Sequence, residues 1–147
     1  FAAVFTSPLQ RAIRTCALAG FAPQAVADAD LVEWNYGAYE GKRTDEIHAL
    51  RPGWNLFRDG CPNGEDAAAV GARADRVIAH VRAASGNVLV ISSAHILRVL
   101  AARWLGLEPG GGRYLVLGTG SLSIMGYEHD RSEPVLRLWN DACHTQS

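Results

Sequence analysis

The chain has 147 residues, of which 48% are hydrophobic and 20% charged, and its formal net charge is −1. This length suits one domain with its own core, and the charge gives no indication of a nucleic-acid or acidic-membrane partner. No apolar run is long enough to cross a bilayer. The three well-separated cysteines (Cys16, Cys61 and Cys143) fit a reduced, cytoplasmic protein without a zinc site.

The first part of the chain predicts short strands and helices separated by loops. Residues 1–5 are apolar and predict a strand. Ser7 followed by Pro8 predicts the N-terminal cap of a helix over residues 9–19, which Gly20 ends. The pattern then predicts a strand over 25–29, an ordered aromatic loop over 31–42, a helix over 44–50, a long loop over 53–65 and a long helix over 65–84.

The second part begins with a continuous apolar run, Val88 to Ile91, which is typical of a strand covered on both faces. Helical spacing follows from Ile96 to Leu105. A turn is predicted over 109–113, and strands over 114–117, 122–127 and 135–140. Strands that alternate with helices and end in antiparallel pairs predict an α/β fold, a three-layer α/β/α sandwich with a mostly parallel central sheet.

Two serines, an alanine and a histidine connect the strand at Val88–Ile91 to the following helix. Backbone N–H groups converge at a helix N-terminus, and that geometry binds anions such as phosphate. The alternative is a plain connection in which Ser92 or Ser93 caps the helix.

Two further side chains are candidates for phosphate chemistry. Arg11 lies in the first turns of a helix that follows a strand, where a guanidinium can bind phosphate with two hydrogen bonds; the alternative is an exposed helix arginine. Glu33 stands beside Trp34 and Tyr36, and burial against either ring favours the protonated carboxyl of a general acid. Alternatively, Glu33 is a loop carboxylate within a hydrogen-bond network.

Four segments together resemble one family. In chain order they are Ser7-Pro-Leu-Gln-Arg-Ala, Glu33-Trp-Asn-Tyr-Gly-Ala-Tyr-Glu-Gly, Cys61-Pro-Asn-Gly-Glu65 and Ser93-Ala-His-Ile-Leu-Arg-Val-Leu. The chain resembles the histidine phosphatase superfamily, the phosphoglycerate-mutase-like group, over nearly its whole length. The resemblance implies phosphomonoester hydrolysis, or phosphoryl transfer between hydroxyls, through a phosphohistidine and without a metal or organic cofactor.

Site residues follow from the resemblance position by position. Arg11 matches the phosphate-binding arginine, and Glu33 matches the acid that protonates the leaving oxygen. Ser93 and Ala94 are expected to bind phosphate with Arg11. Glu65 is expected at the pocket rim, together with Trp34; a carboxylate favoured by a helix N-terminus is the alternative for Glu65.

The sequence departs from the family in two places. The family's nucleophilic histidine belongs to an Arg-His-Gly motif ahead of the segment at Ser7, and no such motif occurs here. We therefore expect residues 1–147 to form a single domain that lacks its first strand and nucleophile, both lying upstream of Phe1 in the parent protein. Ser93 stands where the family has a second histidine. Its lost charge costs the transition state about 2–4 kcal/mol unless His95 replaces it as a catalytic residue; His95 packed on a strand is the alternative.

We expect a phosphatase that acts on a small phosphorylated metabolite. The stretch from Lys42 to Glu65 is short and has few basic residues, which disfavours a mutase. A catalytically inactive phosphate-binding module stays open because of the two departures, and so does a homodimer.

Overall fold

The computed structural model describes residues 1–145 of the chain. The predicted domain, 1–147, includes residues 146–147, which lie outside the described residues. The elements in chain order are β1 (Ala3–Thr6), α1 (Gln10–Leu18), η1 (Ala22–Gln24), β2 (Ala25–Ala27), η2 (Ala29–Leu31), η3 (Gly37–Tyr39), α2 (Thr44–Leu50), α3 (Leu56–Asp59), α4 (Ala67–Ala83), β3 (Val88–Ile91), α5 (Ala94–Trp104), η4 (Pro109–Tyr114), β4 (Leu122–Tyr127), β5 (Pro134–Asp141) and η5 (Cys143–Thr145).

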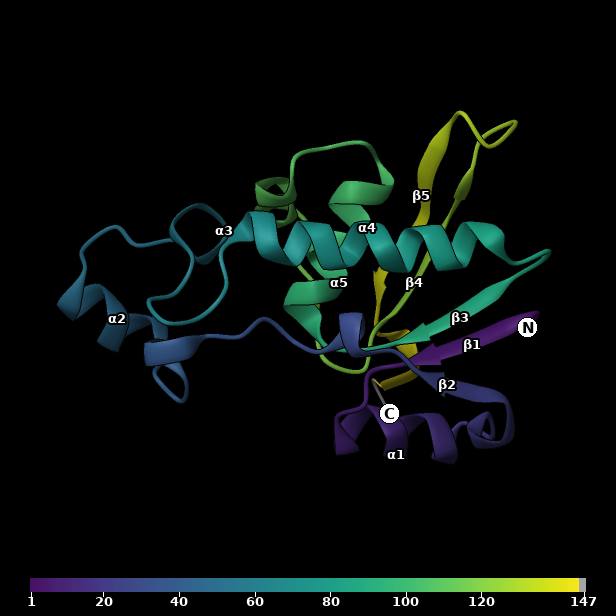
Figure 1. The fold of residues 1–147 in the computed structure, drawn as a ribbon, viewed down its shortest axis with the longest axis horizontal. Helices are drawn as coiled ribbons and strands as arrows, with labels where there is room; N and C mark the ends of the chain where they lie inside the picture. The colour runs from purple at the N-terminus through teal and green to yellow at the C-terminus, as the bar shows by residue number, and fades with distance from the viewer. Residues whose placement is uncertain (146–147) are drawn as a thin grey trace.

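The predicted α/β architecture is confirmed. Within residues 1–145, β2, β1 and β3 form a parallel sheet in that order, with β1 in the middle. Helix α1 lies on one side of this sheet, and α4 and α5 lie on the other (Figure 1). Because the strands are parallel, their carboxyl ends lie along one edge, and ligands of open α/β sheets bind at that edge.

The last two strands, β4 and β5, pair antiparallel as a separate ribbon. The segment that contains α2 extends away from the sheet as an arm (Figure 1). Among residues 1–145, no helix combines the length and apolar character needed to span a bilayer.

Most of the core lies between α4 and α5. The predicted apolar face of α5 is confirmed, since Ile96, Val99, Leu100 and Trp104 are all buried. They pack with Val70, Ala74, Val77 and Ile78 of α4 in one hydrophobic cluster. Burial of this face, rather than local propensity, stabilises both helices.

Strand β3 is less buried than its apolar sequence predicts. All four residues, Val88 to Ile91, are only partly buried, and β3 pairs with β1 alone among the described strands. An edge strand exposes part of its surface even when every side chain is apolar. The prediction of a buried strand therefore holds only in part for the described residues: helices lie on both sides of the sheet, but the open edge leaves β3 partly exposed.

The loop predicted over 53–65 contains a helical turn, α3. Asn55 is its N-cap and accepts a hydrogen bond from the Phe57 backbone N–H at 3.1 Å. Leu56 and Phe57 are buried, so tertiary packing supports a turn too short to stand alone.

No strand forms over residues 114–117, contrary to the prediction. Tyr114 ends η4, and side chains of β5 bind the following segment without a strand ladder. The Trp139 indole donates to the Val116 carbonyl at 2.7 Å, and the Asn140 amide oxygen accepts from the Gly118 N–H at 2.7 Å.

The predicted cap of α1 is also wrong in detail. Leu9 occupies the N-cap, and Ser7 is fully buried at the end of β1, where its N–H donates to the Ile91 carbonyl. Gly20, with φ of +84°, ends the helix as predicted. Ser7 thus joins β1 to β3 beside the site described next.

Gly71 allows α4 and η4 to approach closely, since a Cβ there would lie 2.4 Å from Pro109 Cγ. Helix propensity alone predicts that Gly71→Ala stabilises the protein by about 1 kcal/mol. We expect the opposite sign, a loss of roughly 1–3 kcal/mol, because the methyl group overpacks the contact. Urea unfolding measures this change, and the double variant G71A/P109A should recover part of it. A G71A protein more stable than wild type would contradict the close contact.

Candidate active site

The carboxyl ends of β1 and β3 bring two predicted phosphate-binding residues together. Thr6 and Ile91 are register partners, and Arg11 and Ser93 follow them in the chain. The Arg11 guanidinium donates to Ser93 Oγ from Nη2 at 2.9 Å and from Nε at 3.3 Å. Arg11 is solvent-exposed, so its remaining N–H groups are accessible to an anion.

The Glu33 carboxylate binds the N-terminus of α5. Its Oε1 accepts from Ile96 N at 3.0 Å and from Trp34 N at 2.8 Å, and Oε2 accepts from His95 N at 3.2 Å. A carboxylate at this position satisfies free N–H groups and interacts favourably with the helix dipole. Oε2, which accepts the longer bond from His95 N, also faces the His95 ring, with Nδ1 3.8 Å away.

Glu33 makes the capping hydrogen bonds that the alternative interpretation of this turn gives to Ser92 or Ser93. Ser93 is the N-cap residue of α5, yet its side chain makes no capping hydrogen bond. Its hydroxyl is therefore available to Arg11 instead. Ser92 donates to the Leu31 carbonyl, which fastens the segment before Glu33 to the end of β3.

One backbone donor at this turn stays free for a ligand. Among residues 1–145, no acceptor binds the N–H of Ala94, the first residue of α5, whereas Glu33 occupies those of His95 and Ile96. The three predicted phosphate-binding residues therefore present a guanidinium, a hydroxyl and a backbone N–H beside the carboxyl ends of β1 and β3.

His95 lies beside Glu33 and contacts two aromatic rings. Its Nδ1 is 2.6 Å from the Tyr36 hydroxyl and 3.8 Å from Glu33 Oε2. Its ring also packs edge-on against Phe57. Burial lowers the pKa of His95; the Glu33 carboxylate opposes this shift, and Arg98 adds to it. The ring is therefore predominantly neutral near pH 7.

Glu65 and Trp34 lie behind the loop that carries Glu33, and not at a rim as predicted. Trp34 is only 2% exposed, packs against Phe57, and donates its indole N–H to the Glu65 carbonyl at 3.0 Å. The Glu65 carboxylate accepts from Asn35 N at 2.9 Å. Both side chains hold the backbone on the C-terminal side of Glu33.

Arg73, which the sequence analysis did not select, completes this support. It donates twice to the Glu65 carboxylate, at 2.8 Å each, and through Nη1 to the carbonyls of Asp30 and Val32. The ion pair is largely buried, with side chains 14% and 20% exposed. One guanidinium thus fixes the backbone on the N-terminal side of Glu33 and holds Glu65 on the other side.

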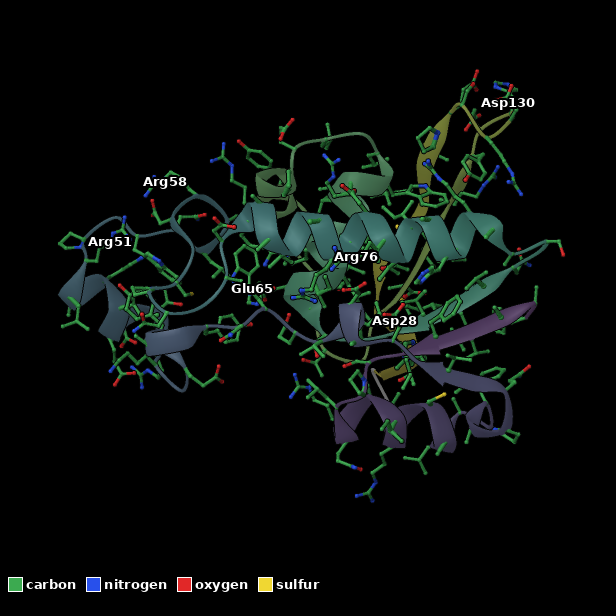
Figure 2. The ribbon with its side chains drawn as sticks, in the orientation of Figure 1. Asp28, Arg51, Arg58, Glu65, Arg76 and Asp130 are labelled. Carbon is green, nitrogen blue, oxygen red and sulfur yellow. The ribbon has the colours of Figure 1, made fainter. Side chains whose placement is uncertain are left out.

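A second arginine of α4 binds the same segment at the surface. Arg76 forms a paired hydrogen bond with the Asp30 carboxylate, and this contact lowers the pKa of Asp30. Figure 2 shows Glu65 and Arg76 beside α4, and Asp28 at the end of β2. Arg76 is more than half exposed, so its ion pair contributes less than that of Arg73.

Arg98 is another residue that the sequence analysis missed. It lies over the Phe57 ring at 4.4 Å and donates to the Gly112 and Arg113 carbonyls. Burial lowers the pKa of Arg98, and the charges of Glu33 and Tyr36 act in the opposite direction. Its helical position, three residues after His95 and inside the segment that resembles the family, could have indicated a place near the site.

A pocket of about 320 Å³ opens beside His95 toward the arm. Three aromatic side chains line it (Tyr36, Tyr39 and Trp54), together with polar groups of the arm that include Lys42 and Thr44. Tyr39 packs edge-on against Trp54, with ring centroids 5.4 Å apart. The aromatic walls can contact an apolar or sugar-like group.

The two ends of the arm meet through backbone contacts. Ala38 N donates to the Pro62 carbonyl at 2.8 Å. A Cβ at Gly37 would lie 2.3 Å from that carbonyl oxygen, and one at Gly64 would lie 2.3 Å from the Asn35 carbonyl oxygen. Gly37 also has a positive φ of 52°. Only glycine fits at either position.

Within residues 1–145, no group of three or more His, Cys, Asp or Glu side chains is placed to hold a metal ion.

Comparison with known proteins defines the class. The sequence model of the histidine phosphatase superfamily (branch 1) matches residues 1–142. A solved structure of an open-reading-frame product of Mycobacterium tuberculosis has a TM-score of 0.87 at 34% identity, covering 94% of this chain and 71% of that one. The fold is thus phosphoglycerate-mutase-like. The chain belongs to the histidine phosphatase superfamily.

Two curated relatives have names that state an enzymatic activity. An acid phosphatase of Mycobacterium tuberculosis is 38% identical over 128 residues, which cover 86% of this chain and 63% of that protein. A sedoheptulose 1,7-bisphosphatase of Saccharomyces cerevisiae is 37% identical, covering 71% of this chain and 48% of that protein. The chain therefore spans less than two thirds of the length of either relative.

The support around Glu33 is testable by stability. Arg73→Met leaves the Glu65 carboxylate partly buried and unpaired, so we expect a loss of roughly 3 kcal/mol in the free energy of unfolding. Arg76→Met, one turn further along α4 but exposed, is the matched control and should change stability little. Urea unfolding measures both.

The double variant R73M/E65Q separates lost packing from the unpaired charge. It should be more stable than R73M alone, because the neutral amide needs no buried counter-charge. Equal losses for R73M and R76M would show that the Glu65–Arg73 pair does not support the loop.

Proposed function

We propose that the protein containing this chain is a phosphomonoesterase that acts on a small phosphorylated metabolite. One observation carries the proposal: Arg11 and Ser93, from the ends of two neighbouring parallel strands, are hydrogen-bonded beside the helix N-terminus that Glu33 and His95 flank. Positive charge, hydroxyl, backbone N–H and carboxyl groups then surround one position, as the hydrolysis of a phosphate ester requires. The named activities of the two curated relatives support the same reaction.

Each residue has a role in the proposed reaction. Arg11 binds two phosphate oxygens, and Ser93 and the Ala94 N–H each donate to the phosphate group. Glu33 protonates the leaving oxygen through Oε2. His95 donates to the phosphoryl group from its ring and replaces part of what a histidine at position 93 supplies in the family.

The proposed nucleophile is a histidine upstream of Phe1 that forms a phosphohistidine. The open edge of β3 supports this part of the proposal, because β3 has a strand partner on only one side among the described residues. A parallel strand paired there would end at the same sheet edge as β1 and β3. A histidine directly after that strand would reach a phosphate held by Arg11 and Ser93.

The pocket toward the arm is proposed to take the leaving group. Its aromatic walls suit the faces of a sugar or nucleoside, and Lys42 adds one positive charge at the open side. The cytoplasmic location and the homodimer stay predictions of the sequence.

The experiment uses the full parent protein incubated briefly with p-nitrophenyl phosphate and quenched at alkaline pH, which preserves phosphohistidine. We expect release of nitrophenolate and an intact mass increased by one phosphoryl group. Steady-state assays with sugar phosphates then define the substrate. Binding of phosphate without turnover or adduct would favour the alternative, an inactive phosphate-binding module, which the serine at position 93 supports.

Phosphate binding by the chain itself is a separate test. Arg11→Met should weaken the affinity for inorganic phosphate or vanadate roughly 10–100-fold, because two charge-assisted hydrogen bonds are lost. Arg14→Met, an exposed arginine on the same helix, is the control and should leave the affinity unchanged. Isothermal titration calorimetry measures both. Equal affinities for R11M and wild type would remove Arg11 from the site.

A further inference from the structure

The surroundings of His95 differ at its two ring nitrogens. Nδ1 makes a hydrogen bond of 2.6 Å with the Tyr36 hydroxyl. Among residues 1–145, no group hydrogen-bonds to Nε2, although the His95 side chain is only 31% exposed and lines the pocket beside the arm. Nε2 is therefore the ring atom available to a bound ligand.

Which nitrogen carries the proton depends on the hydrogen bond that the other one makes. A tyrosine hydroxyl can donate or accept, so two arrangements satisfy the contact. If Tyr36 donates to Nδ1, the proton of the neutral ring is on Nε2. If Nδ1–H donates to Tyr36, the hydroxyl proton turns to Glu33, and Nε2 becomes an acceptor.

Several contacts favour the first arrangement. The Tyr36 hydroxyl lies 2.6 Å from Nδ1, a short contact that its proton can bridge. The distance of 3.8 Å from Nδ1 to Glu33 Oε2 is too long for a hydrogen bond, so the carboxylate does not hold a proton on Nδ1. An anion beside Arg11 would also favour a donor over an acceptor at Nε2.

We infer that Tyr36 is a positioning residue for His95: its hydroxyl donates to Nδ1 and so keeps the neutral ring in the Nε2–H form, which donates to the phosphoryl group. The inference rests on the proposed function and extends it to a residue outside the phosphate contacts. Tyr36 stands in the same short loop as Glu33, three residues later, so one loop sets both the acid and the tautomer of the histidine. A donor fixed in advance costs no reorganisation when charge develops on the phosphate.

The ring contacts also hold His95 in place. Tyr36 and Phe57 pack edge-on against the imidazole, with centroids 5.8 and 5.6 Å away. Removing only the Tyr36 hydroxyl keeps both ring contacts, so Tyr36→Phe isolates the hydrogen bond. Tyr127→Phe is the matched control, since Tyr127 packs against Trp104 of α5 and is not among the residues that line the pocket.

The test reads the tautomer directly by NMR of protein labelled with ¹⁵N-histidine, at about pH 8, where an imidazole is neutral. His95→Gln identifies the signals. In wild type and Y127F we expect His95 with its proton on Nε2. In Y36F we expect a mixture of tautomers or a proton on Nδ1. A wild-type proton on Nδ1, or a Y36F tautomer identical to wild type, would overturn the inference.

Phosphate affinity provides the functional readout. The apparent dissociation constant rises as the fraction of binding-competent protein falls, so Y36F should bind inorganic phosphate about 2–10-fold more weakly, and Y127F should bind it as wild type does. Unchanged binding by Y36F despite an altered tautomer would overturn the role of Nε2 as a phosphate donor. If wild type binds no phosphate at all, the proposed function fails, while the NMR result still decides whether Tyr36 fixes the ring.

Discussion

The bond between the Glu33 carboxylate and the N-terminus of α5 is the constraint on which the site depends. It joins a loop without regular structure to the helix that follows the phosphate turn. Because Glu33 satisfies the N–H groups of His95 and Ile96, the turn needs no serine as its cap, and Ser93 can bind Arg11. A helix end is usually completed by a neighbour in the sequence. Here a side chain 62 residues away completes it, so the proposed acid and the proposed phosphate-binding turn are brought together by the same contact.

This arrangement needs a loop that keeps its shape. The Glu65–Arg73 pair and the indole of Trp34 provide that shape by binding the backbone on both sides of Glu33. A largely buried ion pair carries a desolvation cost and adds little net stability against an apolar pair. The pair contributes a fixed geometry instead, because a guanidinium with several fixed donors can bind two carbonyls and a carboxylate at the same time.

The spacing of apolar residues along the chain predicted those elements that bury one regularly repeating face. The apolar face of α5 and the alternation of strands and helices follow from spacing alone, and the segments at Ser7, Glu33 and Ser93 identified the site through their resemblance to a family. Packing against distant residues decided the rest. Asn55 was a readable signal for α3, but the burial of Phe57 that makes so short a helix stable was not. The roles of Glu65 and Arg73 depend on how α4 docks against the loop, and no spacing along one helix contains that information.

The backbone contacts that close the base of the arm have a consequence for how ligand specificity can vary within this fold. Gly37 and Gly64 pack backbone against backbone, Ala38 is bonded to Pro62, and Tyr39 packs on Trp54. Residues 40–53 therefore leave and return at a fixed junction, and the entropy cost of closing a loop grows only slowly with its length. That segment supplies Glu40, Lys42, Thr44 and Ile47 to the pocket. Replacing this segment with a segment of another length or charge would change which leaving group the proposed pocket accepts. Glu33 and Arg11 would keep their positions.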